Sequence, residues 1–122
     1  MNSLELVACV DSDNTKAERF SKKYRGKGYI DIHQAIDIHK PDIISVCTTD
    51  ETHFNVVKSI FDSLYLPKII FIEKPVCKTQ EEFEELNNLS KNSQTQVLVN
   101  HSRRFDPRMI SLKERVSKGE FG

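Results

Sequence analysis

The chain has 122 residues, and its 18 lysines and arginines are balanced by 18 aspartates and glutamates. A chain of this length forms one domain at most, and the balanced charge offers no electrostatic attraction for nucleic acid or an anionic membrane. No stretch approaches the about 20 consecutive apolar residues that span a bilayer. We therefore expect neither a nucleic-acid partner nor a membrane.

The three cysteines are odd in number and scattered along the chain. Cys9 and Cys47 lie in apolar, strand-like runs, so we expect buried free thiols rather than disulfides or metal ligands. Free thiols, together with an N-terminus that lacks a signal-peptide pattern, favour a cytoplasmic location. Without a Cys-x-x-Cys pair or a His-Glu-x-x-His motif, we expect no metal site.

The first third of the chain alternates between short apolar runs and amphipathic segments. Asp13 follows the first apolar run and caps a predicted helix, which Gly26 and Gly28 end. A short strand is predicted at residues 29–30. Asp31 then caps a second, shorter helix, which stops before the next proline.

The same alternation continues to the end of the chain. Strands are predicted at residues 43–47, 68–72 and 97–100, and helices begin near Glu51, at Thr79 and at Asp106. Thr79 and Glu82 form a capping box, in which the hydroxyl and the carboxylate each satisfy a free backbone N–H. Apolar strands that alternate with helices imply right-handed crossovers, so the sequence predicts an α/β fold with a parallel sheet and helices on both faces.

Asp11 directly follows the first predicted strand, residues 6–10. In a dinucleotide-binding fold, an acidic residue after the second strand accepts hydrogen bonds from the adenosine ribose and disfavours a 2′-phosphate; alternatively, Asp11 caps the next turn. The glycine-rich phosphate loop of such a fold lies roughly 20 residues before this acid. Only ten residues precede Asp11, and none of the four glycines fits the loop, so we expect these residues to lack a pyrophosphate site.

Polar residues also follow two of the later strands. Thr48, Thr49 and His53 connect a strand end to a helix start, where they either cap and pack the helix or line a cofactor cleft. Arg104 lies in a donor-rich loop after the last strand. That loop is either solvated or part of the same sheet edge.

The run Glu73-Lys74-Pro75 lies where a predicted buried strand meets a loop. Ligands of an open α/β sheet bind at the carboxyl ends of its strands, and a lysine there can transfer a proton to or from a substrate. The alternative is an ordinary polar strand end with a loop proline. The Lys74–Pro75 bond is a candidate for the cis form, because X–Pro is the usual site of cis peptides.

Together these features resemble the nucleotide-binding half of the glucose–fructose oxidoreductase/inositol dehydrogenase (Gfo/Idh/MocA) family, from about Leu6 to Gly122. The resemblance rests on an ordered set of motifs: residues 7–11 (VACVD), residues 41–46 (PDIISV) followed by Thr48, Thr49 and His53, then Glu73-Lys74-Pro75, and Arg103-Arg104-Phe105. It implies that residues 1–122 form a partial, truncated Rossmann-like domain that binds NAD(P). The second, substrate-binding domain of the family is absent from these residues.

The resemblance also implies roles for individual residues. Family members mostly oxidise or reduce a sugar or cyclitol hydroxyl with a tightly held nicotinamide cofactor. Lys74 would then assist proton transfer at the hydroxyl of a small, sugar-like substrate. The cofactor would contact Asp11, Thr48, Thr49, His53, Glu73 and Arg104. Asp11 favours NAD over NADP.

Two departures from the family pattern shape our expectations for activity. The first strand with its phosphate loop is missing from these residues, and so is the second domain. Because hydride transfer needs both halves to position the reactants, we expect this truncated chain alone to be inactive, with cofactor binding in doubt. The alternative is a non-catalytic nucleotide- or protein-binding module on the same fold.

The missing strand also has a structural consequence. In the usual strand order 3-2-1-4-5-6, the first strand lies in the middle of the sheet. Without it, the strand at residues 6–10 loses its bridge to the strand at residues 43–47, and two edges stay unpaired. We expect either that these two strands pair with each other or that another chain, such as a second copy, covers the open edges.

Overall fold

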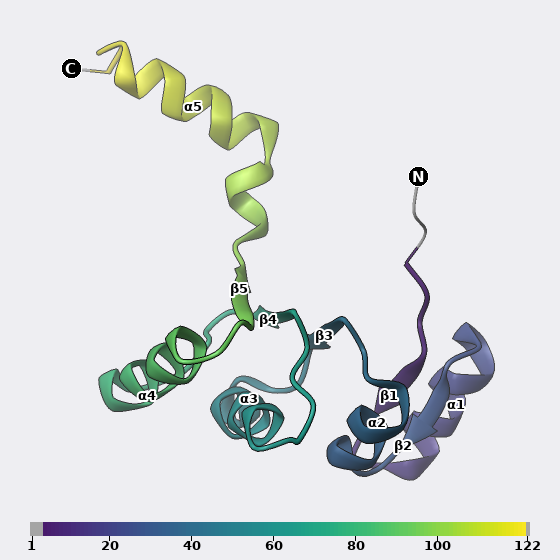
Figure 1. Cartoon of the computed structure of the whole chain (residues 1–122). Helices are drawn as coiled ribbons and strands as arrows, with labels where there is room; N and C mark the ends of the chain where they lie inside the picture. Colours follow the sequence, from purple (N-terminus) through teal and green to yellow (C-terminus); the bar gives the residue numbers. More distant parts are fainter. Residues whose placement is uncertain (1–3, 122) are drawn as a thin grey trace.

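The computed structural model describes residues 4–121 and shows the predicted alternation of strands and helices (Figure 1). The strands are β1 (Ala8–Val10), β2 (Lys27–Tyr29), β3 (Ile43–Val46), β4 (Ile69–Glu73) and β5 (Gln96–Asn100). The α-helices are α1 (Asn14–Tyr24), α2 (Ile32–His39), α3 (His53–Phe61), α4 (Gln80–Lys91) and α5 (Pro107–Ser117). Two short 3₁₀ helices, η1 (Asp50–Thr52) and η2 (Ser102–Phe105), precede α3 and α5.

The second strand lies earlier in the chain than predicted. It covers Lys27–Tyr29 instead of residues 29–30, and Gly28 lies inside it rather than at the end of the preceding helix. A Cβ atom at Gly28 would lie 2.8 Å from the carbonyl oxygen of Ala17 in α1. Glycine therefore lets the helix approach the strand closely.

Side-chain caps start most of the helices, as predicted. The Asp13 and Asp31 carboxylates accept backbone N–H groups of the first turns of α1 and α2. Thr79 and Glu82 form the predicted capping box at the start of α4. In α3, by contrast, the helix begins at His53 directly after η1, without a side-chain cap.

The strands form two parallel sheets rather than one. The first has the order β1-β2 and the second the order β3-β4-β5. The first of the two predicted outcomes, pairing of β1 with β3, is therefore wrong; the second, that another chain covers these edges, stays a prediction. The physical reason lies in α2, which contacts both sheets: its His39 ring meets Tyr29 of β2, while its Ile36 belongs to the core beside β3 and β4. A helix, not a ladder of hydrogen bonds, connects the two sheets.

The main core lies between the three-stranded sheet and helices α2 to α4. It consists of the buried residues Ile36, Val46, Val57, Ile60, Ile70, Ile72 and Leu86. Successive side chains of a strand point to opposite faces, so Phe71, between the fully buried Ile70 and Ile72, points the other way and is 38% exposed. The face of this sheet that carries Phe71 has no helix packed against it in the described chain.

In the two-stranded sheet, helices lie on both faces, as predicted. Helix α1 packs on the face of the two-stranded sheet that Gly28 presents. The next residue, Tyr29, points to the opposite face, where its hydroxyl lies 2.8 Å from Nε2 of His39 in α2. The protein is thus an α/β, Rossmann-like fold.

The last helix extends away from the rest of the molecule (Figure 1). Helix α5 contains no buried residue, although its sequence includes four large apolar side chains: Met109, Ile110, Leu112 and Val116. Between residues 4 and 121, no helix combines the length and the apolar character that a membrane crossing requires.

Candidate functional site

The carboxyl ends of the three parallel strands β3, β4 and β5 lie at one edge of their sheet. In the strand register, Val46 is opposite Ile72, and Glu73 is opposite Asn100. The segments that follow these strands therefore leave the sheet side by side. This edge is where open α/β sheets bind their ligands.

The Glu73 side chain is fixed by the neighbouring strand. The Asn100 side-chain amide donates a hydrogen bond of 2.6 Å to Oε1 of Glu73, and both residues are half-buried. Our sequence analysis did not include Asn100 among the site residues. The available signal was that Asn100 is a polar residue at the end of a predicted strand. Placing it beside Glu73 requires the strand register, which the sequence does not give.

Lys74 leaves the sheet directly after Glu73 and is exposed. Its ammonium group forms no ion pair with any residue of the described chain. The Lys74–Pro75 peptide bond is cis, in agreement with the prediction. The amine at the end of β4 is therefore free to meet a ligand.

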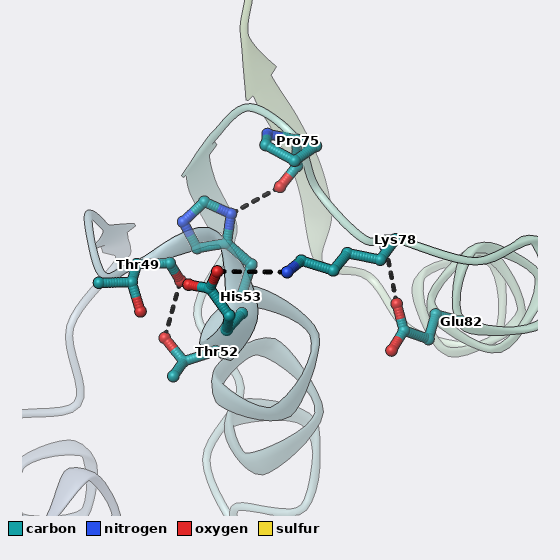
Figure 2. Close-up of polar contacts among 7 residues, drawn as sticks. Thr49, Thr52, His53, Pro75, Lys78 and Glu82 are labelled. Carbon is teal, nitrogen blue, oxygen red and sulfur yellow. Dashed lines mark hydrogen bonds and ion pairs between the residues drawn. The ribbon is translucent and has the colours of Figure 1, made fainter.

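His53 connects the loops that follow β3 and β4 (Figure 2). Its ring is 1% exposed. Nδ1 lies 2.6 Å from the carbonyl oxygen of Pro75, and Nε2 lies 3.1 Å from that of Thr48. The ring thus contacts backbone on both sides and is closed off from solvent.

A second polar link joins the same two loops at the surface. Lys78 Nζ lies 3.3 Å from Oε1 of Glu51, and the Lys78 backbone N–H donates to Oε2 of Glu82 at 2.7 Å (Figure 2). The backbone N–H of Glu51, followed by Asp50 and Lys78, lowers the pKa of the Glu51 carboxyl from 4.5 to about 2. Because folding lowers this pKa, the ionised Glu51 carboxylate stabilises the folded state above pH 4.5, and this stabilisation is lost as the pH falls toward 2.

Thr48 and Thr49 are exposed at the end of β3. The Thr49 carbonyl oxygen accepts hydrogen bonds from the backbone N–H and the hydroxyl of Thr52, at 2.9 and 2.8 Å. The Thr49 side chain makes no capping hydrogen bond, which removes the alternative that it caps the helix. The hydroxyls of both threonines have no hydrogen-bond partner within residues 4–121 and can accept or donate to a ligand.

Asp11 and Arg104 are not joined to this group by hydrogen bonds or ion pairs in the described chain. Asp11 follows β1 in the other sheet, and its Oδ1 accepts the backbone N–H of Asp13 at 2.9 Å. Arg104 lies in η2 and is exposed. It lines an open groove of about 620 Å³ between η2 and α5, together with Met109 and Lys113.

The structure therefore brings together five of the seven predicted site residues: Thr48, Thr49, His53, Glu73 and Lys74. No group of three or more His, Cys, Asp and Glu side chains suited to a metal ion occurs from residue 4 to residue 121.

The cysteines are free but differ in exposure. Cys9 and Cys77 are partly buried, whereas Cys47, which we predicted to be buried, is exposed. Its thiol lies 3.3 Å from the hydroxyl of the exposed Ser45, on the side of the chain opposite the buried Val46. Burial, and then the nearby Asp11 carboxylate, raises the pKa of the Cys9 thiol. Burial, and then Glu82, raises the pKa of Cys77.

We predict that Cys47 is alkylated first when the folded chain meets iodoacetamide at about pH 8, because the thiolate is the reactive form and the other two thiols are shielded and harder to ionise. Peptide mass spectrometry after brief labelling measures the order. Labelling of all three thiols at one rate in urea serves as the control, and equal rates in the folded chain would contradict the prediction.

Comparison with known proteins decides the family. A family model described as "Oxidoreductase family, NAD-binding Rossmann fold" (GFO_IDH_MocA) matches residues 1–101. This chain belongs to the Gfo/Idh/MocA oxidoreductase family. The resemblance predicted from the sequence motifs is thereby confirmed, and so is the Rossmann-type fold.

Curated relatives and solved structures agree with this family. The chain is 26% identical to inositol 2-dehydrogenase of Salmonella typhimurium over 125 residues, which cover 100% of this chain and 36% of the relative. It is 29% identical to D-glucoside 3-dehydrogenase of Escherichia coli, over 99% of this chain and 34% of the relative. The WlbA dehydrogenase of Chromobacterium violaceum, solved with NADH and UDP-GlcNAcA, has the same fold with a TM-score of 0.85 and 17% identity, over 97% of this chain and 33% of that chain. This Gfo/Idh/MocA chain thus spans about a third of the length of the curated relatives that it matches.

Proposed function

We propose that this chain forms part of the nicotinamide-binding half of an oxidoreductase that transfers a hydride between NAD(P) and a hydroxyl of a sugar or cyclitol. The observation that carries the proposal is the end of β4, where Asn100 holds Glu73 and the amine of Lys74 has no ion-pair partner among residues 4–121. The relatives named inositol 2-dehydrogenase and D-glucoside 3-dehydrogenase support this substrate class.

The side chains at the strand ends fit a nicotinamide dinucleotide in their chemistry. Asp11 uses only Oδ1 for its bond to Asp13, so Oδ2 remains to accept hydrogen bonds from the adenosine ribose, which favours NAD over NADP. The free hydroxyls of Thr48 and Thr49 would line the cofactor, and Arg104 would contribute to the same cleft. The pyrophosphate would depend on residues beyond these 122, because no glycine-rich loop is among them.

The residues after β4 would manage the proton of the substrate hydroxyl. A bound nicotinamide supplies the hydride acceptor or donor. In oxidation, the neutral amine of Lys74 would accept the hydroxyl proton, and in reduction its ammonium would return it. Glu73, held by Asn100, would keep the strand end in place beside the nicotinamide. His53 would hold the loops after β3 and β4 in place beside the cofactor through the Thr48 and Pro75 carbonyl oxygens that it contacts.

The remaining parts of the site would come from other segments. We infer that the free edges of β1 and β3 are covered by a further strand or by a second copy of the chain, because unpaired edges in a small domain favour association. A second domain would supply most of the substrate pocket. Free thiols support placing this enzyme in the reducing cytoplasm.

Titration of the purified chain with NADH tests whether a cofactor site is present. Saturable binding at micromolar concentration, measured by NADH fluorescence and by the melting temperature of the protein, would show that a cofactor site exists without a glycine-rich loop among these residues. Asp11→Ala should weaken binding, whereas Asp37→Ala, on the exposed side of α2, should leave it unchanged. No binding up to millimolar NADH would contradict a cofactor site within this chain.

A protein-binding module is the second candidate function. It is favoured by the apolar sheet face that no helix covers, where Ile43, Phe71 and Leu98 are each about 40% exposed. Absence of NADH binding, together with a self-associated or partner-bound form of the chain, would favour this second function.

A further inference from the structure

Helix α5 is amphipathic, and nothing in the described chain covers its apolar face. Met109, Leu112 and Val116 follow the spacing i, i+3, i+7, which places them on one face of the helix, and they are 45%, 42% and 59% exposed. We call these three residues the α5 stripe. A helix of 11 residues is marginal in water without tertiary packing. The α5 stripe therefore requires a partner surface.

A surface that suits such a stripe lies between α4 and β5. It is a hollow of about 140 Å³, lined mainly by the apolar side chains of Phe83, Leu86, Val97 and Val99. Phe83 is 48% exposed, so the hollow is open to a second apolar surface. Amphipathic helices bind to grooves of this kind through apolar side chains at positions i, i+3 and i+7. We call this hollow the α4–β5 groove.

The charges beside the two surfaces are complementary. Helix α4 carries four glutamates and one lysine, whereas α5 carries three basic residues and one glutamate. Neither Glu84, which directly follows Phe83, nor Lys113 of α5 forms an ion pair within residues 4–121. The other two cations of α5, Arg108 and Arg115, already pair with carboxylates next to the helix. Lys113 is thus the cation of α5 that can pair with Glu84.

The groove of the same copy is out of reach of α5. Residues 101–106 connect β5 to α5, and four of them form η2. Figure 1 shows α5 beyond the carboxyl end of β5 and well separated from α4. Turning α5 back onto its own α4 would require η2 to unfold, whereas the groove of a second copy can receive the helix as it stands.

We propose that α5 of one copy binds in the α4–β5 groove of a second copy, and that the second copy returns the contact in the same way. Leu112, at the centre of the α5 stripe, then enters the groove beside Phe83, and Lys113 pairs with Glu84 of the second copy. Short connections favour such an exchange of one element between copies, and reciprocal exchange closes a two-fold dimer. The free edges of β1 and β3 take no part in this contact.

Sedimentation velocity of the purified chain tests the association. We expect a dimer that dissociates on dilution. A chain that stays monomeric at every concentration would overturn the proposal. Because this measurement needs no cofactor, its failure is distinct from a failure of the NADH titration.

Reversal of the two paired charges tests which surfaces meet. In Lys113→Glu, and separately in Glu84→Lys, like charges face each other at both contacts of the dimer, so we expect a dissociation constant raised by roughly tenfold. In an equimolar mixture of the two variants, opposite charges meet at both contacts of a heterodimer. We therefore expect the mixture to associate as tightly as the wild type. Both side chains are exposed, so neither substitution should disturb the fold.

The control is Lys22→Glu, which makes the same change of charge at an exposed position of α1. It should associate like the wild type. A dimer equally weakened by Lys22→Glu would overturn the assignment of the two surfaces. So would a mixture of Lys113→Glu and Glu84→Lys that associates no more tightly than either variant alone, which is the result expected if the dimer forms through the edges of β1 and β3 or if α5 returns to its own groove.

Discussion

Replacing Lys74 with alanine is expected to lower turnover by about 10²- to 10⁴-fold, the range that a positioned general acid or base contributes, while NADH binding is retained. The amine of Lys74 has no ion-pair partner in the described chain, so its removal leaves no buried charge and should not disturb folding. The measurement is the turnover of a sugar or cyclitol, in a reconstructed protein that joins these residues to the segments that complete the site.

The control for this experiment is Lys91→Ala. Lys91 is an exposed lysine in the last turn of α4, so its removal changes the net charge equally without touching the strand ends. Full turnover in Lys74→Ala would contradict the proton-transfer role. Loss of NADH binding together with turnover would instead make Lys74 a cofactor-binding residue.

Replacing Ile72 with alanine is expected to destabilise the fold by about 2–5 kcal/mol, the usual cost of truncating a fully buried isoleucine. Ile72 lies in β4, directly before Glu73, and is 0% exposed. Its side chain packs in the core between the three-stranded sheet and the helices. Against a total stability of about 5–15 kcal/mol for a domain, this loss is large. Urea unfolding followed by circular dichroism measures it, as a lower midpoint with an unchanged slope.

Ile38→Ala is the matched control for the core substitution. Ile38 lies on α2 and is 55% exposed, and alanine favours a helix, so its replacement should change the stability by less than about 0.5 kcal/mol. An Ile72→Ala variant as stable as Ile38→Ala would show that the core between the sheet and α2 to α4 does not support the fold.

Much of the fold could be predicted from the sequence because the signals are local. Apolar runs marked β3, β4 and β5, and Asp13, Asp31 and the Thr79 box marked helix starts. The error at β2 has a specific cause. Glycine often ends a helix, but Gly28 lies inside β2 and lets α1 approach the strand closely. The error at Cys47 arises because the alternation of side chains puts it on the exposed side with Ser45, opposite the buried Val46.

The candidate site was predictable only in part. The run Glu73-Lys74-Pro75 identified the end of β4, and the family model confirms the resemblance on which its roles were based. Asn100 was missed because it meets Glu73 across 27 residues of sequence. The roles assigned to all seven site residues, including Asp11 and Arg104, stay predictions.

The sequence by itself determined the order of strands and helices, the helix caps and the polar residues at each strand end, because these depend on side chains a few positions apart. Only the tertiary structure decided that the strands form two sheets, that Glu73 meets Asn100, and that His53 contacts Thr48 and Pro75. These features depend on strand register and on the paths of loops, which bring together groups that are distant in the chain.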